Sequence, residues 1–84
     1  VEPPEGGDPI RTWRETRDGI SFWWRSIARN KKCVTLDLRT PRGRELMTEL
    51  AARADVFVEN FRPGIMEKWG LGPEDLKARN PGLI

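Results

Sequence analysis

Two short segments of the chain carry the hydrophobic pattern of β-strands. Between residues 33 and 38 every second side chain is apolar (Val34, Leu36 and Leu38), which is the two-residue period of a strand. Residues 56–58 are apolar throughout, as expected of a strand that is covered on both faces. The pattern therefore predicts strands at residues 33–38 and 56–58.

An amphipathic helix is predicted between these two strands, over residues 41–53. Thr40 and Pro41 supply an N-cap and a proline at the first helical position. Apolar residues then recur at helical spacing, at Leu46, Met47, Leu50, Ala51 and Ala54. A strand, a helix and a strand in succession favour a right-handed βαβ unit, and hence an α/β fold.

Three shorter helices are predicted outside this unit. A helical stripe of Phe22, Trp23 and Ile27 lies in residues 21–28, and the others cover residues 64–69 and 73–79. Residues 3–20 are rich in Pro and Gly, which predicts an irregular loop with room for a short helical turn. Because adjacent tryptophans cannot face one core, we expect Trp23 or Trp24 to meet another part of the protein or a partner subunit.

Both ends of the chain have the character of interrupted structure. Residues 1–4 read as the end of a strand that enters a loop, and Leu83 and Ile84 follow a turn signal like the first residues of a strand. A domain of 84 residues would bury only about 60–65% of its unfolded surface. We therefore expect residues 1–84 to be a single incomplete domain, a fragment of a larger α/β protein.

Composition excludes several kinds of site. The chain has one cysteine and no histidine, so neither a disulfide framework, an ordinary zinc site nor a Ser-His-Asp triad can form. It also lacks the glycine-rich loops of dinucleotide-binding and P-loop proteins. No apolar run is long enough to span a membrane, and the lone cysteine favours a cytoplasmic setting.

Charge gives little indication of a nucleic-acid partner. The chain has 15 Lys and Arg residues against 13 Asp and Glu, a formal net charge of +2. Arg and Trp residues are interleaved in residues 11–32, but Glu15 and Asp18 lie among them and aromatic residues make up only 8% of the chain. We therefore expect no nucleic-acid binding.

The turn over residues 59–64 is the first candidate for chemistry. It leaves the carboxyl end of the predicted second strand and enters a predicted helix, a place where open α/β sheets bind ligands. Free N–H groups there and the charge of Arg62 attract phosphate, Asn60 offers a donor and an acceptor, and Phe61 offers a flat face to an adenine ring. The alternative is an ordinary loop in which Asn60 caps and Phe61 packs inward.

A second candidate surrounds the first predicted strand. Basic residues 29–32 precede it and Arg39 follows it, and such groups can neutralise the phosphates of a nucleotide. A solvated basic face is the more common explanation of such a run. Cys33 is expected to be an inert thiol, and Asp37 either holds a loop or contacts a ligand.

The run NKKCVTLDLRTPRGRELMTELAARADVFVENFRPG resembles the family III (CaiB/BaiF-type) coenzyme A transferases, a family that includes α-methylacyl-CoA racemases. Further matches are Gly6-Gly7-Asp8-Pro9-x-Arg11, Gly70-Leu71-Gly72 and Asn80-Pro81-x-Leu83-Ile84. The resemblance covers nearly the whole chain in order. It departs at Cys33, where many members have Ser, and at Pro3, where some have an arginine that contacts CoA.

The resemblance implies a partial Rossmann-like CoA-binding domain with acyl-CoA as substrate and without a metal. The family binds CoA through positions that match Leu36, Asp37, Leu38, Arg39, Asn60, Phe61, Arg62 and Lys68. Its catalytic aspartate would lie beyond residue 84, so no catalytic residue is assigned here. The resemblance also implies an interlocked homodimer.

The function that follows is transfer of CoA between an acyl-CoA and a small carboxylic acid, with this chain supplying part of the CoA site. An α-methylacyl-CoA racemase and a non-catalytic binding module are the alternatives.

Overall fold

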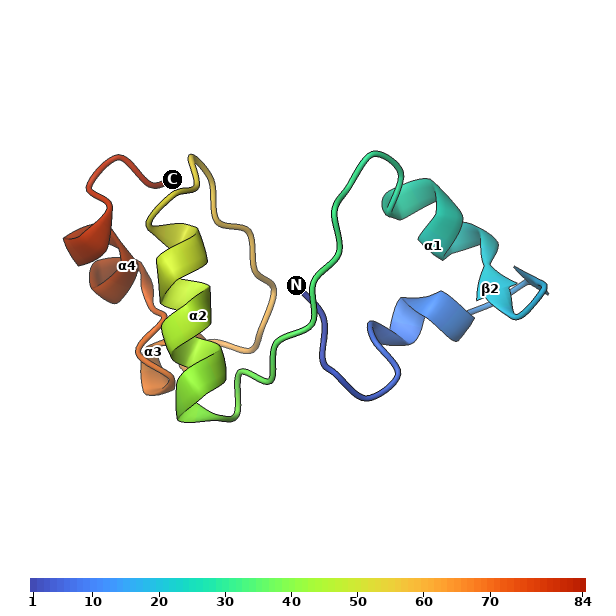
Figure 1. Ribbon diagram of the computed structural model, residues 1–84, viewed down its shortest axis with the longest axis horizontal. Coiled ribbons are helices and arrows are strands. Elements are labelled where there is room, and N and C mark those ends of the chain that lie inside the picture. The colour runs from blue at the N-terminus through green and yellow to red at the C-terminus, as the bar shows by residue number, and fades with distance from the viewer. The chain divides into compact units, whose positions relative to one another are not determined.

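The computed structural model describes all 84 residues, which form two compact units, Val1–Leu36 and Asp37–Ile84 (Figure 1). Helices dominate both units, and a small sheet lies in the first. The chain is therefore an α/β structure in the broad sense. The expectation that residues 1–84 make up a single incomplete domain stays a prediction.

The first unit contains a 3-10 helix, a β-hairpin and one α-helix. The 3-10 helix η1 spans Pro9–Thr12, and the strands β1 (Thr16–Arg17) and β2 (Ile20–Ser21) pair antiparallel. Asp18 and Gly19 join these strands with φ angles of 54° and 74°, as a tight hairpin turn requires. The short helical turn allowed for residues 3–20 is present as η1, but the expectation of an irregular loop there is wrong at this hairpin.

Helix α1 (Phe22–Ile27) begins directly after β2. The fully buried Ser21 caps it, since its hydroxyl accepts hydrogen bonds from the N–H groups of Trp23 and Trp24 at 3.0 and 3.4 Å. Both tryptophans lie under arginines, Trp24 under Arg11 and Trp23 under Arg14. The helix predicted over residues 21–28 is confirmed.

The second unit is built on helices α2 (Pro41–Ala51), α3 (Ile65–Lys68) and α4 (Pro73–Arg79). The buried apolar side chains of the protein all belong to this unit: Met47, Ala51, Met66, Leu71, Leu76 and Leu83. Figure 1 shows α2 in green and yellow beside α4 in red. The three helices confirm the sequence-based predictions, although α2 ends two residues before residue 53.

Asn80 joins the ends of the two longer helices. Its side-chain amide, just after α4, donates hydrogen bonds to the carbonyls of Ala51 and Ala54 at 3.3 and 2.8 Å. These bonds connect the end of α4 to the last residue of α2 and to the turn after it, where the Ala51 carbonyl also accepts from the Ala54 N–H at 3.2 Å.

The strand predicted at residues 33–38 does not form. Its only ladder contact is one parallel bridge, in which Glu2 donates to the Val34 carbonyl and accepts from the Leu36 N–H, both at 2.9 Å. A strand needs successive backbone pairs, and a hydrophobic pattern alone does not supply them.

The strand predicted at residues 56–58 is also wrong. Ile84 donates to the Asp55 carbonyl at 3.1 Å and accepts from the Phe57 N–H at 2.8 Å, which is again a single parallel contact. The segment is not covered on both faces, because Val58 is 87% exposed. With neither strand present, the predicted βαβ unit is absent.

No helix of the structure is both long and apolar enough to cross a membrane.

Candidate functional site

Asp37 and Arg39 lie together in the loop that leads into α2. The Asp37 carboxylate accepts hydrogen bonds from the Arg39 backbone N–H at 3.0 Å and from its guanidinium at 2.8 and 3.1 Å. These bonds from Arg39 lower the pKa of Asp37 below its usual value. The aspartate therefore holds the loop, one of the two roles that the sequence left open for it.

The start of α2 fixes the backbone of the same loop. The Asp37 carbonyl accepts hydrogen bonds from the Thr40 hydroxyl at 2.8 Å and from the Thr40 N–H at 3.1 Å. The same hydroxyl caps the helix by accepting from the Gly43 N–H at 3.1 Å. Thr40 thereby joins the helix N-terminus to the candidate site.

Arg44 is a residue that the sequence analysis missed. It is half-buried in the first turns of α2, and its guanidinium Nη1 donates to the carbonyl of Arg39 at 2.9 Å and to that of Leu38 at 3.2 Å. Two predicted CoA-binding residues are therefore held by one arginine. Hydrogen bonds from a side chain to backbone carbonyls produce no periodic pattern of residue types in the sequence. The hydrophobic pattern therefore could not indicate a role for Arg44.

Two hydrogen bonds order the turn over residues 59–64 and its junction with α3. The Glu59 carboxylate accepts a hydrogen bond from the Phe61 N–H at 2.7 Å, and the Arg62 carbonyl accepts from the Ile65 N–H at 3.1 Å. Gly64 has a φ of 87°, a left-handed conformation that glycine adopts without strain. The turn therefore enters α3 through a defined backbone path.

Phe61 connects this turn to the end of α3. Its ring meets that of Trp69 edge-to-face, with centroids 5.5 Å apart and an interplanar angle of 71°. Phe61 still exposes 47% of its surface, so it does not pack inward as an ordinary loop residue would. Because Trp69 directly follows Lys68, the contact holds the turn against the helix that carries Lys68.

Three polar or basic residues of the candidate site are available to a ligand. Asn60, Arg62 and Lys68 are exposed, and their side chains make no hydrogen bond or ion pair. Helix α3 has only four residues, so its dipole is small and the attraction for an anion would come from the charges of Arg62 and Lys68.

Leu36 is the one predicted site residue in the first unit, where it ends the parallel contact with Glu2. The Glu2 carboxylate is buried and accepts from Arg11 Nε and Nη2 at 2.6 and 2.8 Å and from the Asp8 N–H at 2.8 Å. A Cβ on Gly7 would come within 2.7 Å of both the Glu2 carboxylate and the Arg11 guanidinium. The Gly-Gly-Asp-Pro-x-Arg motif is thus a clamp on Glu2.

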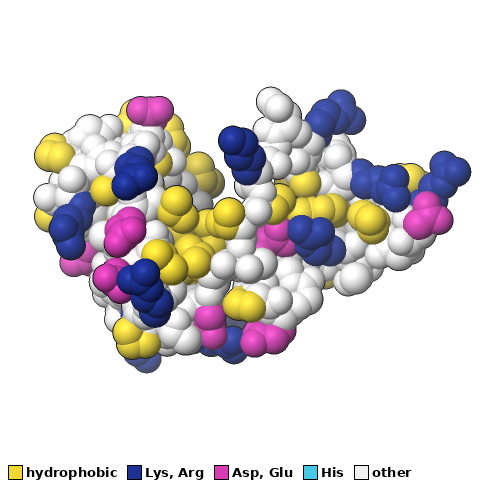
Figure 2. All heavy atoms as spheres, in the orientation of Figure 1, with side chains coloured by type: hydrophobic (Ala, Val, Ile, Leu, Met, Phe, Trp, Pro, Cys, Tyr) yellow, Lys and Arg dark blue, Asp and Glu magenta, His cyan; other side chains and the backbone are white.

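The other basic residues lie among acidic ones within each unit. Residues 29–32 are exposed, and the Lys31 ammonium donates to the Ile27 carbonyl. Figure 2 shows Lys and Arg side chains interspersed with Asp and Glu over the face that it draws. Within each unit, charges of both signs therefore share the surface that Figure 2 draws.

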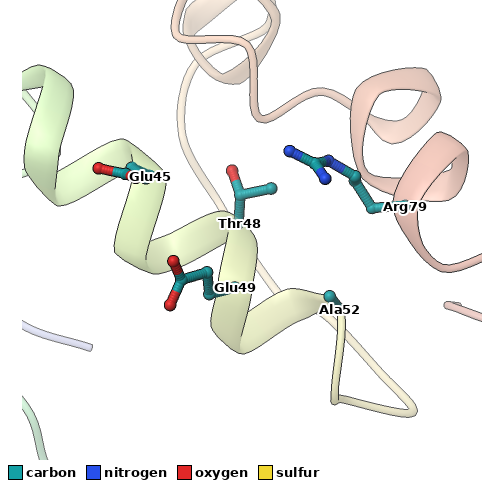
Figure 3. Close-up of a pocket in the computed structure, with 5 residues that line it drawn as sticks. All are labelled: Glu45, Thr48, Glu49, Ala52 and Arg79. Carbon is teal, nitrogen blue, oxygen red and sulfur yellow. The ribbon is translucent and has the colours of Figure 1, made fainter.

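A cavity of about 260 Å³ lies elsewhere in the second unit, lined by Glu45, Thr48, Glu49, Ala52 and Arg79 (Figure 3). The Arg79 guanidinium extends toward Thr48, whereas the two carboxylates point away from it along α2. None of the predicted site residues lines this cavity.

Known proteins match the whole chain. Residues 1–84 match the model of CoA-transferase family III. Succinyl-CoA–D-citramalate CoA-transferase of Chloroflexus aurantiacus is 55% identical over 85 residues, which cover 100% of this chain and 21% of that protein. Succinyl-CoA:glutarate CoA-transferase of Homo sapiens is 42% identical over 85 residues, which cover 100% of this chain and 19% of that protein.

The solved structures give the same result. The crystal structure of a CaiB/BaiF family protein from Brucella suis matches with a TM-score of 0.87 and 44% identity, over 99% of this chain and 23% of that chain. The chain spans about a fifth of the length of the curated relatives that it matches.

Proposed function

The chain belongs to CoA-transferase family III, and we propose that the protein transfers coenzyme A between an acyl-CoA and a carboxylic acid. The family membership expected from the sequence is confirmed. The observation that carries the proposal is the match over all 84 residues to relatives named as CoA-transferases that pair succinyl-CoA with D-citramalate or glutarate. These names favour transfer over racemisation or a non-catalytic module.

We propose that this chain supplies part of the CoA site through the eight residues named from the sequence. Their chemistry suits the parts of CoA: Arg39, Arg62 and Lys68 are cations for the phosphates, and Phe61 has an exposed ring for the adenine. Asn60 offers a donor and an acceptor to the ribose or the base. The exposed side chains of Asn60, Arg62 and Lys68 support this assignment.

The remaining features of the proposal concern the protein as a whole. We expect the CoA-binding domain to be Rossmann-like, with the catalytic aspartate outside residues 1–84. We also expect an interlocked homodimer in the cytoplasm, with an acyl-CoA and a small carboxylic acid as its partners and no metal. The exposed rings of Trp13 and Trp23 are consistent with contacts to further protein.

The direct test is an assay of the purified full-length protein with succinyl-CoA and a panel of carboxylic acids that includes citramalate, malate and glutarate. We expect at least one acid to accept CoA, seen as a new thioester by mass spectrometry. Absence of transfer over a broad panel of acyl donors and acids would overturn the proposal.

A further inference from the structure

Arg44 connects helix α2 to the loop that precedes it. Its Nη1 lies 3.2 Å from the Leu38 carbonyl oxygen and 2.9 Å from that of Arg39. Both acceptors belong to the segment that we propose to contact CoA. The arginine itself is half-buried, so a substantial part of its side chain is withdrawn from water.

The bonds of Arg44 complement those that Thr40 makes. The Thr40 hydroxyl and N–H both donate hydrogen bonds to the carbonyl of Asp37, at the start of the loop. Arg44 donates to the next two carbonyls, those of Leu38 and Arg39. Because a charged donor bonds a carbonyl more strongly than a neutral one does, Arg44 has a large influence on the orientation of these two peptide groups.

Neighbouring Arg42 provides a contrast on the same helix. Its guanidinium pairs with Glu45 at 2.6 Å on the exposed surface, where both side chains are more than half exposed. Exposed pairs of this kind contribute little to stability or to the shape of a loop. The contact of Arg44 with the loop is therefore a specific feature of that position.

We propose that Arg44 is a positioning residue for CoA binding, which holds the Leu38–Arg39 backbone in the conformation that receives the nucleotide. This inference rests on the proposed function. A loop that is already ordered loses less conformational freedom on binding, so its restraint strengthens affinity without a direct contact to the ligand. Loss of the restraint should weaken CoA binding and leave the chemical step unchanged.

The test compares Arg44→Ala, Arg44→Lys and the control Arg42→Ala in the full-length protein by steady-state kinetics. For Arg44→Ala we expect the KM for acyl-CoA to rise about tenfold, because the loop then loses its restraint and more conformational freedom is lost on binding. We expect kcat and the KM for the acceptor acid to stay within about twofold, in the range of ordinary surface effects. Arg44→Lys should recover part of the loss, and Arg42→Ala should resemble the wild type.

An unchanged KM for acyl-CoA in Arg44→Ala would overturn the inference, as would an equal loss in kcat and in affinity for both substrates. Arg62→Ala separates this failure from failure of the proposed site. If Arg62→Ala weakens CoA binding and Arg44→Ala does not, only the role of Arg44 is wrong. If Arg44→Ala does not fold, Arg44→Gln replaces it: its amide can still donate to one carbonyl, so we expect a smaller rise in the same KM, and no rise would overturn the inference.

Discussion

Gly43 lies against the backbone of Asp37 so closely that no side chain fits between them. A Cβ on Gly43 would overlap the Asp37 carbonyl oxygen and come within 2.6 Å of the carbonyl carbon. The obstacle is backbone that Thr40 already holds by two hydrogen bonds, so it cannot move aside easily. Glycine has a low helix propensity, but Gly43 permits the close approach of the candidate loop to α2.

Gly43→Ala should destabilise the full-length protein by about 3 kcal/mol, because overpacking against fixed atoms is costly. It should also weaken CoA binding, since Asp37 and the residues after it must move. Chemical denaturation and a titration with CoA measure the two effects.

Gly82→Ala is the matched control for this substitution. Its Cβ would meet only the Asn80 side-chain oxygen, at 3.6 Å, which is ordinary contact. We expect a change of less than about 0.5 kcal/mol. Equal effects of the two alanines would contradict the role of Gly43.

The clamp on Glu2 predicts a dependence of stability on pH. Hydrogen bonds from Arg11, with smaller contributions from the Asp8 N–H and Cys33, lower the pKa of Glu2 from 4.5 to about 2, although burial acts in the opposite direction. The folded protein therefore binds this proton less readily than the unfolded chain does. Its contribution to stability is complete above pH 4.5 and is lost as the pH falls from 4.5 toward 2.

Unfolding of the wild type and of Glu2→Gln, followed between about pH 6 and about pH 3, measures this contribution. The glutamine variant should lose less stability over that range than the wild type does. Arg11→Ala should destabilise the protein at neutral pH, because it leaves the Glu2 carboxylate without its cation. Arg14→Ala, which removes only an exposed stack on Trp23, should cost far less. Parallel pH profiles for wild type and Glu2→Gln would contradict the account.

The ring contact between Phe61 and Trp69 predicts an energetic coupling. The variants Phe61→Leu, Trp69→Leu and the double substitution form a cycle from which the pair energy is obtained. We expect a coupling of about 1 kcal/mol in the unfolding free energy, typical of edge-to-face rings. Additive effects would show that the two rings do not support the turn.

The helices could be predicted from the sequence because their signals are local. Thr40 and Pro41 start α2, Pro73 starts α4, and Gly70 follows the end of α3 with a φ of 68°. Each signal acts within one turn of the helix that it limits. No distant part of the chain is needed to interpret it.

The strands could not be predicted in the same way. The alternation over residues 33–38 is present, but a strand exists only where a neighbouring segment supplies successive backbone bonds. Here Glu2 supplies one bridge and Ile84 makes one parallel contact with the later segment. The hairpin at Asp18 and Gly19 could not be predicted from hydrophobic pattern either, because strands of two residues are too short to show alternation. Only its turn residues carry a local signal.

Part of the candidate site could be predicted from the sequence, and part depends on contacts that only the structure shows. Asn60, Phe61 and Arg62 could be named from residue type and position, and their contact with CoA stays a prediction. The hydrogen bonds of Arg44 and the close approach of Gly43 depend on a three-dimensional fit between a helix and the loop before it. No spacing in the sequence encodes that fit.

The most direct measurement of the central claim is the affinity of the full-length protein for CoA, by isothermal titration, in the wild type and in the variants Arg62→Ala and Arg53→Ala. Both arginines are exposed and form no ion pair, so each substitution removes one solvent-exposed positive charge and breaks no side-chain hydrogen bond or ion pair within the protein. We predict that Arg62→Ala weakens CoA binding about tenfold, as expected for the loss of one contact to a phosphate, and that Arg53→Ala leaves it unchanged. Equal affinity of the wild type and Arg62→Ala would contradict the placement of CoA at this turn.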